Sequence, residues 1–411
     1  MTSRERVRKL LARQPVDRLP NGLGGCETAG LHSVAYHKLK RILGVNDPAN
    51  RICTFMYNTI FEPPVLKALG GDVILLGSPR MCPSRFWGPN AASEWKPLSL
   101  WGTELQVPKQ WRFRQEADGA CWWDERFLCP AGGFFFDPPA PPAVESYLEQ
   151  QEFPSLHFQP THEISETLLR RLEEDAKWLY ENTDYAVFCG ETIQDLQLYP
   201  GGLQSWWMRM VEEPAACHDF LGQAVETSLA QLRQLDQAVG KYCETLLIAD
   251  DMGDTRGVTI GPELWRKIYK PHYQRLFGEW HKISRMKVNL HCCGSISEIL
   301  GDLIECGVDL CNPVQISAND MNPKALKEKF GNKIIFYGGV YDAVLLGQES
   351  SDEAVYEAVK ANIRTFSRGG GYLFAGVHNL PPDMPEGHLK AMLQAYQDCC
   401  REPELVSGGI K

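Results

Sequence analysis

The stretch MKVNLHCCGSISEILGDLIECGVDLCNPV, residues 286–314, contains a short apolar run, a helical pattern and a second apolar run. The two runs, 286–291 and 308–314, are typical of buried β-strands. The segment between them, 295–307, has apolar residues at helical spacing and ends in glycine, a common helix stop. A strand, a helix and a strand in this order predict two parallel strands with the helix packed on their sheet.

Similar units extend through the chain. Helical patterns over 322–332 and 351–370 separate the later apolar runs, and the opening 18 residues predict an amphipathic helix that ends before Pro15. Eight candidate strands with short loops predict an α/β fold, and they favour a (β/α)8 barrel of the TIM type over an open doubly wound sheet. Besides 286–291 and 308–314, the candidate strands are 18–25, 72–77, 185–191, 245–250, 334–340 and 371–377.

Residues 81–150 interrupt this alternation and are rich in Trp, Phe, Gly and Pro. Within them, 101–130 predicts an antiparallel hairpin or meander that turns at EADGA, 116–120, and DPPAPPA, 137–143, predicts a stiff connector. We interpret 81–150 as an insertion that caps one end of the barrel, within a single domain that spans 1–411. Its aromatic side chains either pack on one another or wall a pocket for a flat substrate, and the sequence leaves both readings open.

The composition excludes several classes of protein. The chain has 411 residues and a net charge of -10, with no basic stripe of the kind that binds nucleic acid. No window is apolar enough to cross a membrane, and the N-terminus lacks the apolar core of a secretory signal. We therefore expect a cytoplasmic protein whose 14 cysteines are mostly thiols.

Polar and ligand-type side chains recur where the predicted strands end. In a parallel barrel these ends meet at one face, where functional groups lie. Their number predicts a functional site at that face. The residues are Glu191, Asp250, Asp251, His291, Cys293, Asn312, Gln315, Asp342, His378 and Asn379. Of these, Glu191, Asp250 and Asp251 are the candidate catalytic residues.

His291 and Cys293 form a candidate metal-binding pair. In extended chain, residues two apart point to the same side, so these two side chains face one site while Cys292 faces the core. His378, at the end of the last strand, is the natural third ligand, and three nitrogen and sulfur ligands with one open position are typical of catalytic zinc. The alternative is that both histidines are hydrogen-bonded barrel residues and Cys293 is a buried thiol.

Asp250 and Asp251 also allow two interpretations. They are a carboxylate pair suited to acid–base chemistry, or one caps the next helix while the other pairs with Arg256. The sequence contains no phosphate-binding loop, no G-x-G-x-x-G after a strand and no G-x-S-x-G, which argues against nucleotide-binding and serine-hydrolase functions.

Five stretches together resemble the uroporphyrinogen decarboxylase superfamily. They are RERVRKLLARQPVDRLP (4–20), PVLKALGGDVI (64–74), LLIADDMGDTRGVTIGPELWRKIYKPHYQRL (246–276), KVNLHCCGSISEILGDLIECGVDLCNPVQ (287–315) and GGGYLFAGVHNLPPDMP (369–385). The resemblance spans nearly the whole chain and is least clear in the insertion. It implies a distorted (β/α)8 barrel with its site at the C-terminal ends of the strands.

Local residues separate the two chemistries of this superfamily. The corrinoid-linked methyltransferases have H-x-C-G on one strand and a third zinc ligand, usually cysteine, in a late loop. His291-Cys292-Cys293-Gly294 fits the first motif, but His378 stands where the thiol methyltransferases have cysteine and where the decarboxylases have a functional histidine. The decarboxylases' catalytic aspartate and arginine-bearing loop have no counterpart that we can match.

The resemblance therefore implies a zinc-dependent methyltransferase. A His-Cys-His ligand set leaves zinc with a formal charge of +1, which suits polarising the oxygen of a methyl ether. We expect O-demethylation, of a methoxylated and aromatic substrate, with Asn312, Gln315, Asp342 and Asn379 as substrate-binding residues. The chain has no D-x-H-x-x-G motif, so the methyl-accepting corrinoid would come on a separate protein.

Other functions stay open at this point. They are a methylcobamide:thiol methyltransferase, a metal-free decarboxylase, and a non-catalytic barrel that binds a methylated ligand or a corrinoid protein. The sequence gives neither the direction of methyl transfer nor the oligomeric state, for which a homodimer is one possibility.

Overall fold

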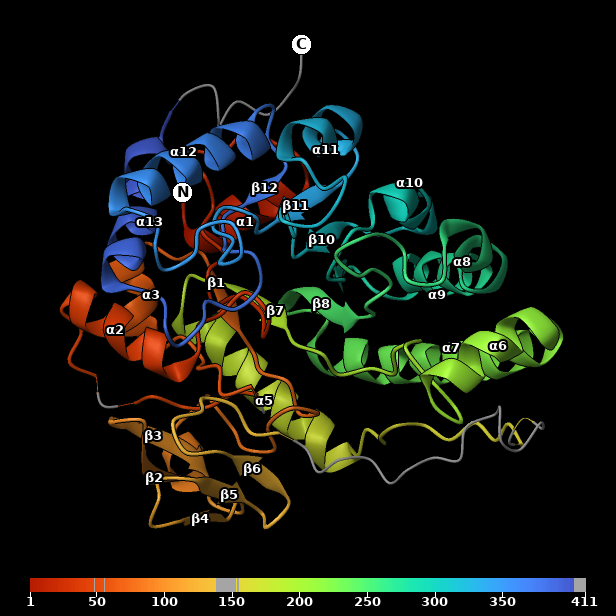
Figure 1. Ribbon diagram of the computed structural model, residues 1–411, viewed down its shortest axis with the longest axis horizontal. Coiled ribbons are helices and arrows are strands. Elements are labelled where there is room, and N and C mark those ends of the chain that lie inside the picture. The colour runs from red at the N-terminus through yellow and green to blue at the C-terminus, as the bar shows by residue number, and fades with distance from the viewer. Residues whose placement is uncertain (48, 55, 138–152, 154, 403–411) are drawn as a thin grey trace.

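The computed structural model describes residues 1–411 except 48, 55, 138–152, 154 and 403–411. Its centre is a curled, seven-stranded sheet in which all neighbouring strands are parallel, consistent with a TIM-type barrel (Figure 1). The prediction of an α/β fold with a parallel sheet is thus confirmed. In spatial order the strands are β1 (Val73–Leu75), β7 (Ala186–Cys189), β8 (Cys243–Ala249), β9 (Lys287–His291), β10 (Leu310–Asn312), β11 (Ile335–Tyr337) and β12 (Tyr372–Leu373).

Helices surround the outer face of this sheet (Figure 1). The N-terminal helix begins with a capping box, in which Thr2 and Glu5 bond each other's backbone N–H groups. Of the helices described, none is long and apolar enough to cross a membrane. Their bounds are α1 Ser3–Leu11, α2 Ser33–Leu43, α3 Pro63–Leu69, α5 Glu166–Asn182, α6 Leu203–Glu212, α7 Pro214–Val239, α8 Pro262–Ile268, α9 Lys270–Ile283, α10 Ser297–Cys306, α11 Pro323–Phe330, α12 Asp352–Ser367 and α13 Glu386–Cys399.

The short segment Pro20–Gly22 lies between the two edge strands. On one side Phe374, just after β12, donates its N–H to Pro20 O (3.0 Å) and accepts from Gly22 N–H (2.9 Å). On the other side Asp72, just before β1, donates its N–H to Asn21 O (2.8 Å). The segment therefore occupies the place of an eighth strand, with Asn21 as its single parallel bridge.

The prediction of a strand over 18–25 is wrong in extent. Pro20 has no N–H to donate, and Gly24 has a positive φ of 80°, so the chain turns out of the ladder after Gly22. The other seven predicted strands each overlap an observed strand.

Residues within 81–150 form two small antiparallel sheets beside α2 and α5 (Figure 1). In the second, the segment 116–120 turns the chain between β4 and β5. Most of the predicted connector 137–143 and the end of the insertion lie outside the described residues. That the insertion caps the barrel, and that the chain is one domain, stay predictions. The strands are β2 (Trp95–Leu100), β3 (Thr103–Pro108), β4 (Phe113–Gln115), β5 (Cys121–Trp123) and β6 (Phe127–Cys129).

Residues 100–136 of the insertion, with Ile52 and Tyr57, have an apolar core separate from that of the barrel, whereas Phe86, Trp87 and Trp95 pack in the barrel core. Trp111 and Trp123 lie 4.5 Å apart between ring centroids, and Tyr57 stacks on Phe136 at 4.7 Å. These aromatic side chains thus pack mainly on one another.

A fully buried carboxylate holds the closing segment in place. Asp72 accepts hydrogen bonds from Arg6 (2.6 Å), from both terminal nitrogens of Arg18 (2.6 and 2.8 Å) and from Asn21 N–H (2.8 Å). Two guanidinium charges thus face one carboxylate. Asp17, which pairs with Arg6 at 2.6 Å, balances the second guanidinium charge. Helix α1, the closing segment and the start of β1 therefore meet at one carboxylate.

Replacing Asp72 by Asn should lower the free energy of unfolding by about 3–5 kcal/mol, because it leaves buried guanidinium charge uncompensated. Urea denaturation at pH 7 measures the change. Glu386→Gln is the control, since its pair with Arg41 is exposed and should contribute about 0–1 kcal/mol. Equal costs for the two variants would contradict this account of the closing segment.

Candidate metal and substrate site

The structure brings His291, Cys293 and His378 together at the C-terminal ends of β9 and β12. Their ligand atoms all lie within 4.8 Å of one another, and His291 Nε2 is 3.4 Å from Cys293 Sγ. His378 has a φ of 57°, in the left-handed region that residues other than glycine adopt uncommonly. Backbone strain of this kind is common at functional sites.

The neighbouring strand fixes the orientation of the His291 ring. Asn312, at the end of β10, accepts a hydrogen bond from His291 Nδ1 (3.1 Å) and one from the Thr28 hydroxyl (2.7 Å) through the same oxygen. The amide orientation is set because Asn312 Nδ2 donates to Tyr337 O (3.3 Å). His291 Nδ1 therefore holds the proton, and the Nε2 lone pair faces Cys293 and His378.

The two adjacent cysteines have different surroundings. Cys292 is 1% exposed, and its sulfur accepts the N–H of Met252 at 3.2 Å. Cys293 instead lies beside His291, and its N–H donates to Asp251 Oδ1 at 2.7 Å. Residue alternation at the strand end thus separates a core cysteine from one in the site.

These three side chains fit zinc. Tetrahedral zinc places neighbouring nitrogen and sulfur ligands about 3.3–3.6 Å apart, and the His291–Cys293 distance of 3.4 Å agrees with this. Burial lowers the pKa of His291 and lowers that of His378 to about 4, so both rings are neutral and keep a lone pair at pH 7. Burial also raises the pKa of the Cys293 thiol, and a nearby cation would favour the thiolate form.

The two aspartates at the end of β8 differ strongly. Asp250 is 1% exposed and accepts from Tyr273 OH at 2.7 Å, and burial together with Asp195 raises its pKa well above the usual range. The Asp251 side chain is 45% exposed, with Oδ1 3.8 Å from His291 Nε2.

One interpretation of this aspartate pair is wrong. Neither carboxylate pairs with Arg256, which binds Asp254 at 3.0 Å, and α8 begins after Gly261 without a side-chain cap. The acid–base interpretation therefore remains for Asp250 and Asp251.

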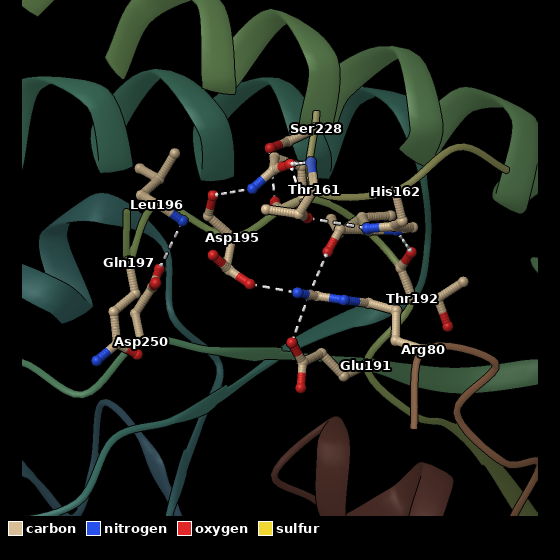
Figure 2. Close-up of polar contacts among 12 residues, drawn as sticks. Arg80, Thr161, His162, Glu191, Thr192, Asp195, Leu196, Gln197, Ser228 and Asp250 are labelled. Carbon is tan, nitrogen blue, oxygen red and sulfur yellow. Dashed lines mark hydrogen bonds and ion pairs between the residues drawn. The ribbon is translucent and has the colours of Figure 1, made fainter. Parts of the chain in front are cut away.

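Glu191, at the end of β7, belongs to a buried charged cluster. Figure 2 shows the Arg80 guanidinium between Glu191, with which it forms an ion pair, and Asp195, 2.8 Å away. Burial raises the pKa of Glu191 to about 7, although Arg80 opposes the shift. Asp250 lies at the edge of this cluster and accepts from Leu196 N–H at 3.3 Å.

The four residues predicted to bind substrate bond other parts of the protein. Asn312 orients His291, Gln315 accepts from Gly294 N–H (2.8 Å), and Asn379 accepts from Gly30 N–H (3.0 Å). Asp342 is 2% exposed and accepts from Ser317 N–H (3.0 Å) and Val344 N–H (2.9 Å). None of the four lines the cavity beside the aspartates. Their substrate-binding role stays a prediction, and their observed contacts are structural.

A cavity of about 300 Å³ opens next to Asp250 and Asp251. No residue from the described part of the insertion, 81–137, lines it. Its aromatic side chains come instead from the segment after β7 and from α6, α8 and α9. They are Tyr199, Trp207, Trp265, Tyr269 and Tyr273.

Sequence reasoning missed Glu27. This residue is 2% exposed, its Oε1 accepts from Glu191 N–H at 3.1 Å, and its Oε2 has no hydrogen-bond partner among the described residues. Burial raises the pKa of Glu27 to about 7. It follows the closing segment Pro20–Gly22, so the rule that functional groups lie at strand ends could have identified it.

The chain is similar to known proteins in part of its sequence and in its fold. Residues 199–399, slightly less than half of the chain, match the family model described as uroporphyrinogen decarboxylase (URO-D). A solved structure titled "methyltransferase from Methanosarcina mazei" is 15% identical in sequence to this chain. The match covers 97% of this chain and 99% of that chain, with a TM-score of 0.54. At this identity the likeness is one of fold alone.

A second solved structure, titled "Structure of GH113 beta-1,4-mannanase", is 12% identical over 56% of this chain and 79% of that chain. Its TM-score of 0.28 is too low to support an argument. No curated protein is significantly similar to the chain.

Glu27→Gln should stabilise the protein at pH 8 but change its stability little at pH 4. The unfolded chain loses the Glu27 proton near the ordinary pKa of 4.5, whereas the folded protein keeps it up to about pH 7. Stability of the unmodified protein therefore falls as pH rises through this interval, by up to about 3 kcal/mol. Thermal or urea unfolding of both proteins across this pH range measures the difference, and a pH-independent difference would contradict the assignment.

Proposed function

Because residues 199–399 match the uroporphyrinogen decarboxylase family and the His-Cys-His trio lies at the strand ends, we propose that the protein is a zinc-dependent methyltransferase. It moves a methyl group from a methoxylated aromatic molecule to the corrinoid of a separate protein. The observation that carries this proposal is the convergence of His291, Cys293 and His378 within 4.8 Å.

The surroundings of these side chains indicate which atom of each would bind zinc. His291 presents Nε2 because Asn312 accepts its Nδ1 proton, and Cys293 presents its sulfur while Cys292 is held by Met252. His378 would contribute a neutral ring as the third ligand, whereas a cysteine thiolate at this position would add a second negative charge to the ligand set. Zinc held by these residues is a Lewis acid with a formal charge of +1, suited to drawing charge from an ether oxygen.

The reaction breaks the bond between the methyl carbon and the ether oxygen. The reduced Co(I) corrinoid of the partner would supply the electron pair for the new bond to the methyl carbon and become Co(III), while the ether oxygen keeps the electron pair of the broken bond and takes up a proton to become a phenol. Asp250 or Glu191 supplies that proton. Both carboxyl groups are buried with raised pKa values, which suits them to hold a proton near neutral pH.

Two surfaces support the choice of substrate and partner. The five aromatic side chains of the cavity beside Asp250 suit a flat ring, a role first expected of the insertion. The loop after β11 exposes Val344 and Leu345, at 78% and 56%, on the side where the strands end. An apolar surface there suits docking of the corrinoid protein over the site.

The protein purified with its native metal should contain about one zinc per chain. Cys293→Ser should lose most of it, whereas Cys292→Ser should retain it, because the Cys292 sulfur faces Met252 N–H. Elemental analysis of the three proteins measures zinc directly, without an activity assay. Loss of zinc from Cys292→Ser alone would contradict the assignment of ligands.

With a reduced corrinoid protein, the enzyme should demethylate an aryl methyl ether and release one phenol per methyl group transferred. The absorbance change from Co(I) to methyl-Co(III) and the phenol yield measure the reaction. Asp250→Asn should reduce turnover at least about 10²-fold, the scale of a general acid, and Asp254→Asn on the same loop is the matched control.

Two results would contradict this function. Formation of a methyl thioether from the methylated corrinoid and a thiol, with no ether consumed, would identify a thiol methyltransferase. Release of carbon dioxide from a porphyrinogen by the metal-free protein would identify a decarboxylase.

A further inference from the structure

The lining of the cavity beside Asp250 has an unusual charge pattern. Five aromatic rings and the side chains of Asp250 and Asp251 line it, and it has no Lys, Arg or His among its described lining residues. Aromatic faces carry partial negative charge, so the rings and the exposed Asp251 carboxylate together attract organic cations. A volume of about 300 Å³ is at the lower end of the range for small-molecule sites.

The rings on one side of the cavity are arranged as a continuous wall. Trp265 and Tyr273 are nearly parallel, with centroids 5.9 Å apart and an interplanar angle of 18°. Tyr269 continues this row, 6.3 Å from Tyr273 at 28°. From the other chain segment, Tyr199 contributes a ring that is 37% exposed and therefore accessible to a ligand.

Neither acidic side chain of the cavity forms an ion pair with a Lys or Arg among the described residues. The Asp251 side chain is 45% exposed, accepts from the backbone N–H of Cys293, and forms no ion pair with a Lys or Arg among the described residues. Asp250 is 1% exposed, and its Oδ1 has no hydrogen-bond partner in the described part of the chain.

The basic residues near this region are already paired. Arg80 binds Glu191 and Asp195 on the barrel side, and Lys270 on α9 binds Asp302 and Glu305 on the outer side, at 2.6 and 2.8 Å. Neither of these basic side chains is therefore free to pair with Asp251 from the cavity side.

We propose that this cavity recognises the ammonium group of an organic cation, so that the methyl donor is a methoxylated amine. The ammonium group lies against the rings of Tyr199, Tyr269 and Tyr273 and pairs with Asp251. Asp251 also lies 3.8 Å from His291 Nε2, which places the cavity next to the trio. The fate of the methyl group rests on the proposed function, but recognition of the cation does not.

The test compares two ligands of the same skeleton that differ only in the terminal group, para-methoxyphenethylamine, whose ammonium group is charged at pH 7, and para-methoxyphenethyl alcohol, whose hydroxyl is neutral. Isothermal titration calorimetry on the whole protein, without a corrinoid protein, measures both affinities. The amine should bind about tenfold more tightly than the alcohol, the scale of a cation–π contact with partial desolvation.

Single substitutions test which residues cause the difference in affinity between the amine and the alcohol. Asp251→Asn removes the charge and keeps an oxygen to accept from Cys293 N–H, and Tyr199→Leu removes an exposed ring. Each should weaken binding of the amine about 3–10-fold more than binding of the alcohol, so that the ratio of the two affinities falls toward one. Tyr199→Phe, which keeps a ring, should restore most of the affinity, and Asp219→Asn, exposed on α7, is the control for charge.

Equal affinities for the amine and the alcohol, or no binding of either, would overturn the inference. An effect of Asp219→Asn as large as that of Asp251→Asn would do the same, since it would indicate attraction to the acidic protein as a whole. Tight binding of the amine without methyl transfer to a corrinoid would instead count against the proposed function and leave the cation site standing.

Discussion

The buried carboxylate of Asp72 is the interaction on which the barrel depends. A parallel sheet of seven strands has two open edges, and the segment between them contributes only one bridge, at Asn21. Backbone pairing alone would hold this segment weakly. Asp72 adds hydrogen bonds from Arg6, Arg18 and Asn21 N–H, so one group joins the N-terminal helix, the closing segment and the first strand. Thr28, which bonds Asn312, follows this segment in the chain, and so the orientation of His291 depends on the same closure.

In the candidate site, the residues that hydrogen-bond His291 and Cys293 determine how these two side chains are oriented. His291, Cys293 and His378 provide the donor atoms, but Asn312 selects the tautomer of His291, and Gln315 holds the loop at Gly294. Asp251 bonds the backbone of Cys293 and at the same time lines the cavity. Asp251 therefore links the trio to the cavity, and a molecule bound in the cavity beside Asp251 is adjacent to the trio.

Much of this arrangement could be predicted from the sequence, because strand ends in a parallel sheet converge by geometry. This reasoning placed His291 with His378, which are 87 positions apart in the chain, and it assigned Cys292 to the core. It failed where side-chain partners decide the role. Asn312, Gln315 and Asn379 lie near strand ends as predicted, yet their hydrogen bonds go to the protein. It also attributed the aromatic lining to the conspicuous insertion. The rings of the cavity come instead from helices in which Trp and Tyr at helical spacing look like ordinary core residues.

The separate apolar core of the insertion has a consequence for how the molecule opens. Tyr57, Trp111, Trp123 and Phe136 pack in a cluster distinct from that of the barrel. Regions with their own core can lose and regain structure as independent cooperative units. Hydrogen exchange in the β4–β6 sheet can therefore follow its own opening rate while the parallel sheet stays closed. Sequence changes in this small lobe can accumulate with little effect on the geometry of His291, Cys293 and His378, which would leave it free to diverge between related proteins.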